Sequence, residues 1–257
     1  MTLTARLPNQ PAATLFQASA YRVRLASNSA DVQAAQKLRF LVFNVEMREG
    51  LQRSFETCLD ADRFDAVCDH LLVEDIRTQQ IVGTYRLQTG DRAAGNQGYY
   101  SEREFHFEPF EPLRPMMLEL GRACIRADHR SFKVLTLLWD AIATYARAVG
   151  TRYLIGCSSL TCQDAAVGAA AYQRLLPHLA PAPLRTKPVE SFACPLHVVA
   201  PNAPKIPKLL TAYLGLGAFI CGAPAIDREF GTIDFLTLVD LQQPSLGRRL
   251  ARFSGGL

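Results

Sequence analysis

One acidic side chain, Glu119, stands in the middle of an apolar run from Met116 to Ile125 that has the composition of a buried strand. An ionised carboxylate there costs on the order of several kcal/mol unless it is solvated, paired or functional. Strict alternation would put Glu119 and Arg122 on opposite faces, but a bulge at Gly121 would bring both to one side and free backbone amides. The carboxylate could then take the proton of an amine while the amides stabilise an oxyanion, which is the chemistry of acyl transfer. A structural ion pair of Glu119 with Arg122 or Arg86 is the alternative, and the residues alone do not separate the two.

A second group of charged residues could bind an amino acid. Such a substrate presents an ammonium and a carboxylate, so its site needs charges of both signs. Arg39 and Arg86 could clamp the carboxylate with paired donors, while Asp62 or Asp65 could receive the amine. The alternative is that the acidic run containing Asp62 and Asp65 is a solvated loop.

A third group lies where a helix is expected to begin. Arg130, Ser131 and Lys133, together with the unpaired amides of the first helical turn, could hold one phosphate group. This would suit a donor that carries a phosphodiester.

Hydrophobic periodicity predicts the elements that must position these side chains. Strands are expected over 21–26, 68–74, 81–88, 116–125, 152–157, 196–199 and 231–240. Helices are expected over 29–45, from about residue 131 to Gly150, over 164–176 and over 209–219, with a short helical turn at 101–105. This order predicts an α/β (α+β) fold in which a mixed central sheet carries helices on both faces.

The expected organisation is one domain over residues 21–245, on which a C-terminal extension (200–245) packs. Residues 1–20, with Pro8 and Pro11, are expected to form a disordered leader without the apolar core of a signal peptide. Residues 246–257 are expected to form a basic tail, for which docking of a carrier protein is a minor alternative.

Bulk composition excludes several classes of protein. A net charge of +4, without a Lys/Arg-rich run among aromatic residues, argues against nucleic-acid binding. The seven cysteines are odd in number and scattered, and the five histidines are dispersed, so we expect reduced thiols and no metal site. No apolar stretch reaches the ~18 to 20 residues that a membrane span requires. A cytoplasmic protein, at most peripheral on the inner membrane, is therefore expected.

Several motifs in a fixed order give the chain a resemblance to a known family. It resembles the GNAT N-acyltransferases, and more narrowly the ornithine-acyl-carrier-protein N-acyltransferases of bacterial ornithine-lipid synthesis. These are often labelled hemolysin-like, and are similar to the acyl-homoserine-lactone synthases. The resemblance covers roughly residues 20–245, and the residues that carry it include Leu38-Arg39-Phe40-x-Val42-Phe43, Asp62-Arg-Phe-Asp65 with Cys68-Asp69-His70, Gly83-Thr-Tyr-Arg86, Glu119-Leu-Gly121-Arg122 with Asp128-His-Arg130, Tyr213-Leu-x-Leu-Gly217 and Cys221-Gly222-x-Pro224.

The resemblance implies a GNAT-like fold, a catalytic group and an acceptor-binding group. Glu119, Gly121 and Arg122 would be catalytic, and Arg39, Phe43, Asp62, Asp65 and Arg86 would bind the substrate, since the matching acidic and arginine positions of the lactone synthases form an essential cluster. The implied reaction moves a 3-hydroxyacyl chain from acyl carrier protein to the α-amine of ornithine and gives lyso-ornithine lipid. A different acceptor such as glycine, lactone synthesis, and a non-catalytic membrane-binding or lytic protein are the alternatives.

One departure from the wider superfamily bears on the donor. GNAT proteins that use coenzyme A carry Arg/Gln-x-x-Gly-x-Gly/Ala, whose glycines let backbone amides approach a pyrophosphate. Here the turn from Arg126 to Lys133 has no glycine. A carrier-protein phosphopantetheine arm has a single phosphodiester, so the loss favours an acyl-phosphopantetheine co-substrate on acyl carrier protein, with no permanently bound cofactor.

Overall fold

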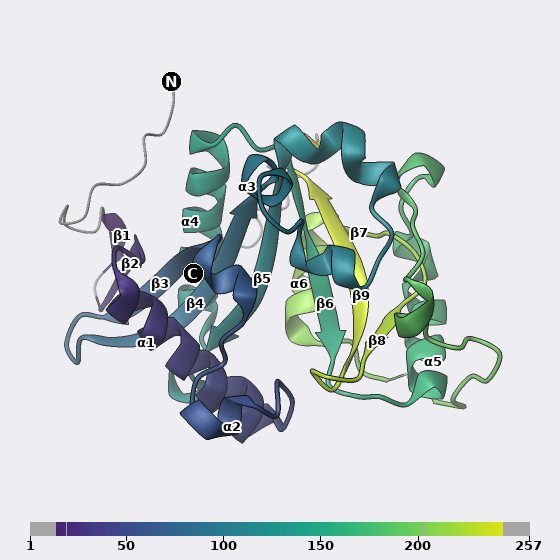
Figure 1. Ribbon diagram of the computed structural model, residues 1–257, viewed down its shortest axis with the longest axis horizontal. Helices are drawn as coiled ribbons and strands as arrows, with labels where there is room; N and C mark the ends of the chain where they lie inside the picture. Colours follow the sequence, from purple (N-terminus) through teal and green to yellow (C-terminus); the bar gives the residue numbers. More distant parts are fainter. Residues whose placement is uncertain (1–13, 19, 203, 244–257) are drawn as a thin grey trace.

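The computed structural model describes residues 14–18, 20–202 and 204–243, and its framework is one mixed sheet (Figure 1). Within these residues nine strands follow the order β1-β2-β3-β4-β5-β6-β9-β7, with β8 paired to β9. The β5–β6 pair is parallel, and every other strand pair is antiparallel. The strands are β1 (Thr14–Ala18), β2 (Tyr21–Leu25), β3 (Asp69–Asp75), β4 (Gln80–Thr89), β5 (Met117–Ile125), β6 (Tyr153–Leu160), β7 (Phe219–Ile220), β8 (Ala225–Asp227) and β9 (Thr232–Asp240).

Helices cover both faces of this sheet. On one face, Leu38 of α1 packs on Cys124 of β5. On the opposite face, Leu138 of α4 packs against Tyr85 and Leu87 of β4. The predicted mixed sheet with helices on both faces is therefore confirmed. The helices are α1 (Ser29–Phe40), the π-helical η1 (Leu41–Met47), α2 (Ser54–Thr57), α3 (Gly90–Ala94), α4 (Phe132–Ala148), α5 (Ala165–Leu175) and α6 (Lys208–Leu216), with 3₁₀ turns that include η3 (Tyr100–Arg103), η4 (Glu108–Met116) and η5 (Ala127–His129).

Side-chain caps fix where the long helices begin. The side chain of Asn28 accepts a hydrogen bond from the amide of Asp31 at 2.9 Å, and Ser131 and Asp164 cap α4 and α5 in the same way. The helix expected over 29–45 is α-helical only to Phe40 and then widens into η1. A π-helical turn changes which side chains face the sheet, and such turns are frequent at functional sites.

Strand β5 carries the predicted bulge. Thr84 of β4 pairs with Cys124 and Arg86 pairs with Gly121, so Arg122 and Ala123 both stand opposite Tyr85. Arg122 takes the left-handed conformation (φ +50°), which costs a residue with a Cβ about 1 kcal/mol. The parallel pairing with β6 ends at Glu119↔Ile155, just before the bulge. These two features open a hollow between β5 and β6.

Three expectations about organisation differ from the structure. Residues 14–18, assigned to a disordered leader, form β1 because they pair with β2. Residues 196–199, expected to be a strand, lie in a loop. The segment 200–245 is more than an extension packed on a domain, because β9 lies inside the sheet between β6 and β7. Residues 1–13 and the expected basic tail (246–257) lie outside the described residues.

Two further sequence expectations concern cysteines and membrane spans. All seven cysteines are free thiols. Among the described residues, no helix combines the length and apolarity that crossing a bilayer requires.

Candidate active site

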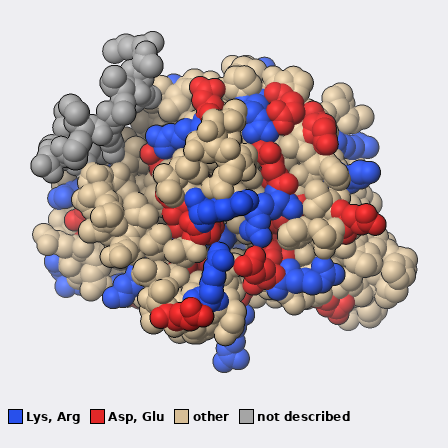
Figure 2. All heavy atoms as spheres, viewed as in Figure 1, with Lys and Arg blue, Asp and Glu red and all other residues tan. Residues whose placement is uncertain are grey.

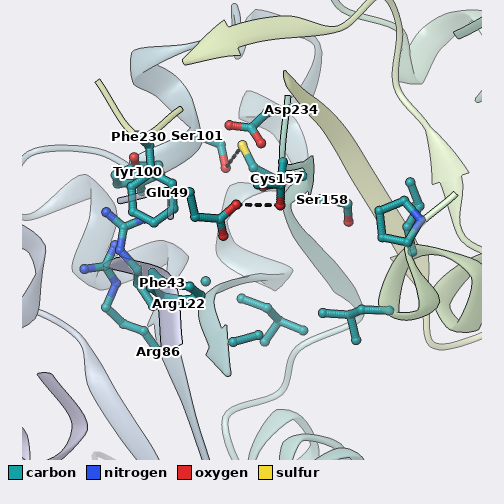
Figure 3. A pocket seen from close by; sticks show the side chains of 18 of the residues that line it. Phe43, Glu49, Arg86, Tyr100, Ser101, Arg122, Cys157, Ser158, Phe230 and Asp234 are labelled. Atoms are coloured by element: carbon teal, nitrogen blue, oxygen red, sulfur yellow. Dashed lines mark hydrogen bonds between the residues drawn. The ribbon is translucent and has the colours of Figure 1, made fainter. Parts of the chain in front are cut away.

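A cavity of about 200 Å³ lies at the bulge, where β5 and β6 part (Figure 3). Its floor comes from β5 and β6, and its rim from η1, the start of α6 and the turn before β9. On the face shown in Figure 2, acidic and basic side chains gather around a hollow in the middle of the molecule. The residues that line the cavity include Phe43, Glu49, Arg86, Tyr100, Ser101, Glu119, Gly121, Arg122, Cys157, Ser158, Thr161, Leu210, Phe230 and Asp234.

Glu119 lines this cavity but its carboxylate is already well occupied. Oε2 accepts the amide of Tyr100 at 2.8 Å, and Oε1 accepts both the amide and the hydroxyl of Ser101 at 2.8 and 2.6 Å. No ion pair joins it to Arg86 or Arg122. Burial raises the pKa of Glu119, against the lowering effect of these hydrogen bonds. Glu119 therefore anchors η3, and only Oε2 keeps a lone pair for substrate.

Arg122 reaches the same cavity from the bulge. Its guanidinium carbon lies 4.7 Å from the ring centre of Tyr100 and 4.4 Å from that of Phe230. Nε and Nη2 bind Asp60 and Asp62 at 3.2 Å each. The neighbouring Gly121 also lines the cavity, and a Cβ added there would meet no atom within 4 Å, so the space beside it is open.

The predicted acceptor-binding charges form a closed ionic network behind the cavity. Arg39 pairs with Asp60 at 2.9 Å and Asp65 at 2.7 Å, while Arg86 pairs with Asp62 at 2.6 Å and Asp65 at 3.1 Å. Burial opposes ionisation of Asp62 and Asp65, but the arginines outweigh it and lower the pKa of both carboxyls.

The network separates the five residues assigned to acceptor binding. Of these, Arg86 and Phe43 line the cavity, whereas Arg39, Asp62 and Asp65 do not. Arg39 has 0% of its surface exposed, so in this structure it holds the network together and does not reach a substrate. Phe43 is on η1 and meets the ring of Phe230 edge-on, with 5.5 Å between the ring centres.

The residues expected to hold the donor phosphate lie at the exposed start of α4. Ser131 caps the helix, and Arg130 pairs with Glu46 of η1 and also binds the carbonyl oxygen of Ile125 at 2.9 Å. Lys133 is exposed in the first turn. A phosphate would have to displace Glu46 from Arg130. The turn from Arg126 is braced instead by the bidentate pair of Arg126 with Asp128.

Glu49 is a functional candidate that the sequence did not reveal. Its carboxylate accepts a hydrogen bond from the hydroxyl of Thr161 at 2.7 Å inside the cavity (Figure 3). Burial raises the pKa of Glu49 to about 7, helped by Asp234 and opposed by Thr161 and Arg122. Glu49 lies between the expected helix 29–45 and the expected strand 68–74, where no local pattern singles it out.

A second overlooked group is buried beside the cavity. Atoms of Glu104, Cys157 and Asp234 lie within 4.8 Å of one another. Burial and the neighbouring carboxyl raise the pKa of Glu104, and burial raises that of Asp234. Burial also raises the pKa of the Cys157 thiol, which lies 3.5 Å from the hydroxyl oxygen of Ser101. A protonated thiol is a weak metal ligand, and the expectation of no metal site remains a prediction.

Comparisons with known proteins define the class of this fold and site. The acetyltransferase (GNAT) domain family matches residues 38–140. Two solved structures share the fold over most of both chains. The AHL synthase LasI has a TM-score of 0.50 and 15% identity over 92% of this chain and 96% of that chain. FeeM, an N-acyl amino acid synthase from uncultured soil microbes, has a TM-score of 0.54 and 14% identity over 91% of this chain and 97% of that chain. The fold is that of the GNAT class.

Closer relatives narrow the class to one family. L-ornithine N(alpha)-acyltransferase of Brucella abortus (strain 2308) is 34% identical over 261 residues, covering 92% of this chain and 90% of the relative. The enzyme of the same name from Rhodobacter capsulatus is 34% identical over 243 residues, covering 88% of this chain and 92% of the relative. The chain belongs to this L-ornithine N(alpha)-acyltransferase family, as its motifs indicated.

Proposed function

We propose that the protein transfers an acyl chain from a thioester to the α-amine of L-ornithine. The observation that carries this proposal is the 34% identity to ornithine acyltransferases over 92% of the chain. The cavity supports it, because Arg86 and Arg122 offer guanidinium groups and Glu49 and Asp234 offer carboxyls in one space. An amino acid with a second amine needs both signs of charge.

The reaction forms a C–N bond and breaks a C–S bond. The lone pair of the neutral α-amine attacks the thioester carbonyl carbon, and the negative charge that develops on oxygen is stabilised by backbone amides at Gly121 and Arg122. The C–S bond then breaks, the thiolate leaves, and the nitrogen loses its extra proton. Arg122 and Arg86 orient the carboxylate of the acceptor.

Two carboxylates are candidates for the proton, and we assign it to Glu49. A base works best with a pKa near the operating pH, and Glu49 has one of about 7. Glu119, which the sequence predicted to be the base, already accepts three hydrogen bonds from η3. In this assignment Glu119 is a positioning residue that holds Tyr100 and Ser101 in the cavity wall.

Acyl carrier protein is the proposed donor, and the exposed start of α4 would receive the phosphate of its phosphopantetheine arm. The test gives the purified protein ornithine with either a 3-hydroxyacyl carrier protein or the matching CoA thioester, and detects product by mass spectrometry. Preference for the carrier protein supports the assignment, and activity with CoA alone overturns it. Arg130→Gln should raise KM for the carrier-protein donor and leave kcat unchanged.

We further propose that the product is lyso-ornithine lipid and that the enzyme is cytoplasmic, at most peripheral on the inner membrane. A screen of amine acceptors tests the alternatives, since preferred acylation of glycine would replace ornithine as the substrate. Lactone synthesis is disfavoured because the relatives at 34% identity are named ornithine acyltransferases, whereas the AHL synthase LasI shares only 15% identity with this chain. Membership of an acyltransferase family removes the support for a purely lytic protein.

A further inference from the structure

Besides Glu119, which is held by the Tyr100–Ser101 turn, three carboxyl groups in and beside the cavity lack a basic partner. Every aspartate of the ionic network faces an arginine, but no ion pair within 4.0 Å joins Glu49, Glu104 or Asp234 to a basic side chain in the part of the chain that the structure describes. All three are buried, and Glu104 and Asp234 are 0% and 4% exposed. Burial disfavours the charged forms of these carboxyls, and a cationic group brought to this side of the cavity would offset that cost.

Two oxygens of this group also lack hydrogen-bond donors. Asp234 Oδ2 accepts the hydroxyl of Thr232 at 3.2 Å, and the side chains of Ser159 and Glu104 also hydrogen-bond to Asp234, but no N–H or hydroxyl group donates to Asp234 Oδ1 or Glu104 Oε1. Asp234 lines the cavity, whereas Glu104 lies behind it against the Cys157 thiol, with 3.8 Å between Oε2 and Sγ. Buried oxygens without a donor are rare in native proteins, so these two oxygens keep acceptor capacity for a ligand.

The acidic side chain of Asp234 and the basic side chains lie on different walls of the cavity. Arg86 and Arg122 come from β4 and β5, whereas Asp234 is on β9, on the far side of β6. Figure 3 shows the two arginines at the left and Asp234 towards the top, with Ser101 and Cys157 beside it. A ligand that spans the cavity with a carboxylate at one end therefore meets an acidic wall at the other.

We propose that Asp234, backed by Glu104, receives the terminal ammonium of the acceptor's side chain and makes the enzyme selective for dibasic amino acids. This inference rests on the proposed function and deepens it. The ammonium would supply a positive charge beside these carboxyls and up to three N–H donors for their unpaired oxygens. A site built to bind a charged N–H group strongly rejects an analogue that lacks it.

A divalent cation is the competing occupant of the acidic group. Apart from the Cys157 thiol, the two carboxyls would leave a metal ion with few protein ligands.

The test compares L-ornithine with L-norvaline, which has the same carbon chain but no terminal amine. With wild-type protein and one fixed donor, kcat/KM for ornithine should exceed that for norvaline by about tenfold or more. Asp234→Asn should reduce kcat/KM for ornithine by about 10- to 100-fold and change kcat/KM for norvaline by less than about threefold. The variant would therefore lose the preference for ornithine over norvaline. Asp140→Asn, an exposed aspartate on α4, is the matched control and should change neither acceptor.

Each other result counts against the proposal. Equal losses for both acceptors would give Asp234 a general structural or catalytic role, and an unchanged preference would exclude it from recognition. Loss of the ornithine preference after chelation, with recovery on adding Mg²⁺ or Zn²⁺, would assign the group to a metal. If Asp234→Asn does not fold by circular dichroism, Glu104→Gln takes its place with the same expected change in preference. A wild-type protein that acylates norvaline or glycine and never ornithine would refute the proposed function itself.

Discussion

At the scale of single residues, two buried carboxylates in one cavity differ in their hydrogen bonds. Glu119 accepts three donors from the Tyr100–Ser101 turn, whereas Glu49 accepts one hydroxyl, from Thr161. Both side chains are buried, so the number of hydrogen bonds that each accepts distinguishes the positioning role of Glu119 from the proposed base Glu49.

The proton-accepting role of Glu49 predicts a pH profile. Because the base must be ionised, wild-type kcat/KM should rise with pH through about 7, the pKa of Glu49. Glu49→Gln should lower kcat/KM by about 10²-fold and remove this step. The acceptor's own ammonium titrates in both proteins, so the difference between their profiles isolates Glu49. Glu56→Gln, exposed on α2, is the control, and a variant that keeps the step near pH 7 would shift the role to Glu119.

Gly121 predicts a loss of activity without a loss of stability. Its backbone is not left-handed and an added Cβ meets nothing within 4 Å, so Gly121→Ala should fold normally. The methyl group would stand in the cavity at the proposed position of the thioester carbonyl. We expect the denaturant midpoint to stay within error while kcat/KM falls at least tenfold; unchanged turnover would place the thioester elsewhere.

At the scale of elements, the β5–β6 pair is held close on one side of the cavity and open on the other. An added Cβ at Gly156 of β6 would lie only 2.2 Å from the carbonyl oxygen of Leu120. Only glycine allows this approach immediately before the strands part. The contact therefore fixes where the hollow begins.

This close approach predicts a stability effect at Gly156. Gly156→Ala should force β5 and β6 apart and reduce the free energy of unfolding by about 1–3 kcal/mol, or more if the backbone cannot adjust. Urea denaturation followed by circular dichroism measures it. Gly121→Ala on the facing strand is the matched control, and equal stability of the two variants would contradict the packing described here.

At the scale of the whole molecule, the network of Arg39, Arg86 and Arg122 with Asp60, Asp62 and Asp65 joins α1, β4, β5 and the 60–65 segment. Three positive and three negative side chains balance in the interior. Removing one member leaves a buried charge uncompensated.

The network predicts how acid unfolds the protein. The pKa of Asp62 and Asp65 is lowered in the folded state, so their contribution is present above about pH 4, the ordinary aspartate pKa, and is lost as pH falls through the folded pKa. Asp65→Asn should cost about 3–5 kcal/mol at pH 7 and flatten the acid limb of stability against pH. Denaturant titrations from pH 7 to pH 3 measure both, and a parallel acid limb in the variant would refute the assignment.

The sequence by itself determined the strand and helix order around β5, the acyltransferase class and the bulge beside Gly121. Those features follow from local periodicity, caps and motif order, which are written in neighbouring residues. Tertiary structure decided which charges meet. Arg39, Asp62 and Asp65, expected at the substrate, turn inward to one another, whereas Glu49 and Asp234, 185 positions apart, share a cavity because β9 pairs with β6. Burial and pairing depend on partners distant in the chain, so no local pattern could have assigned them.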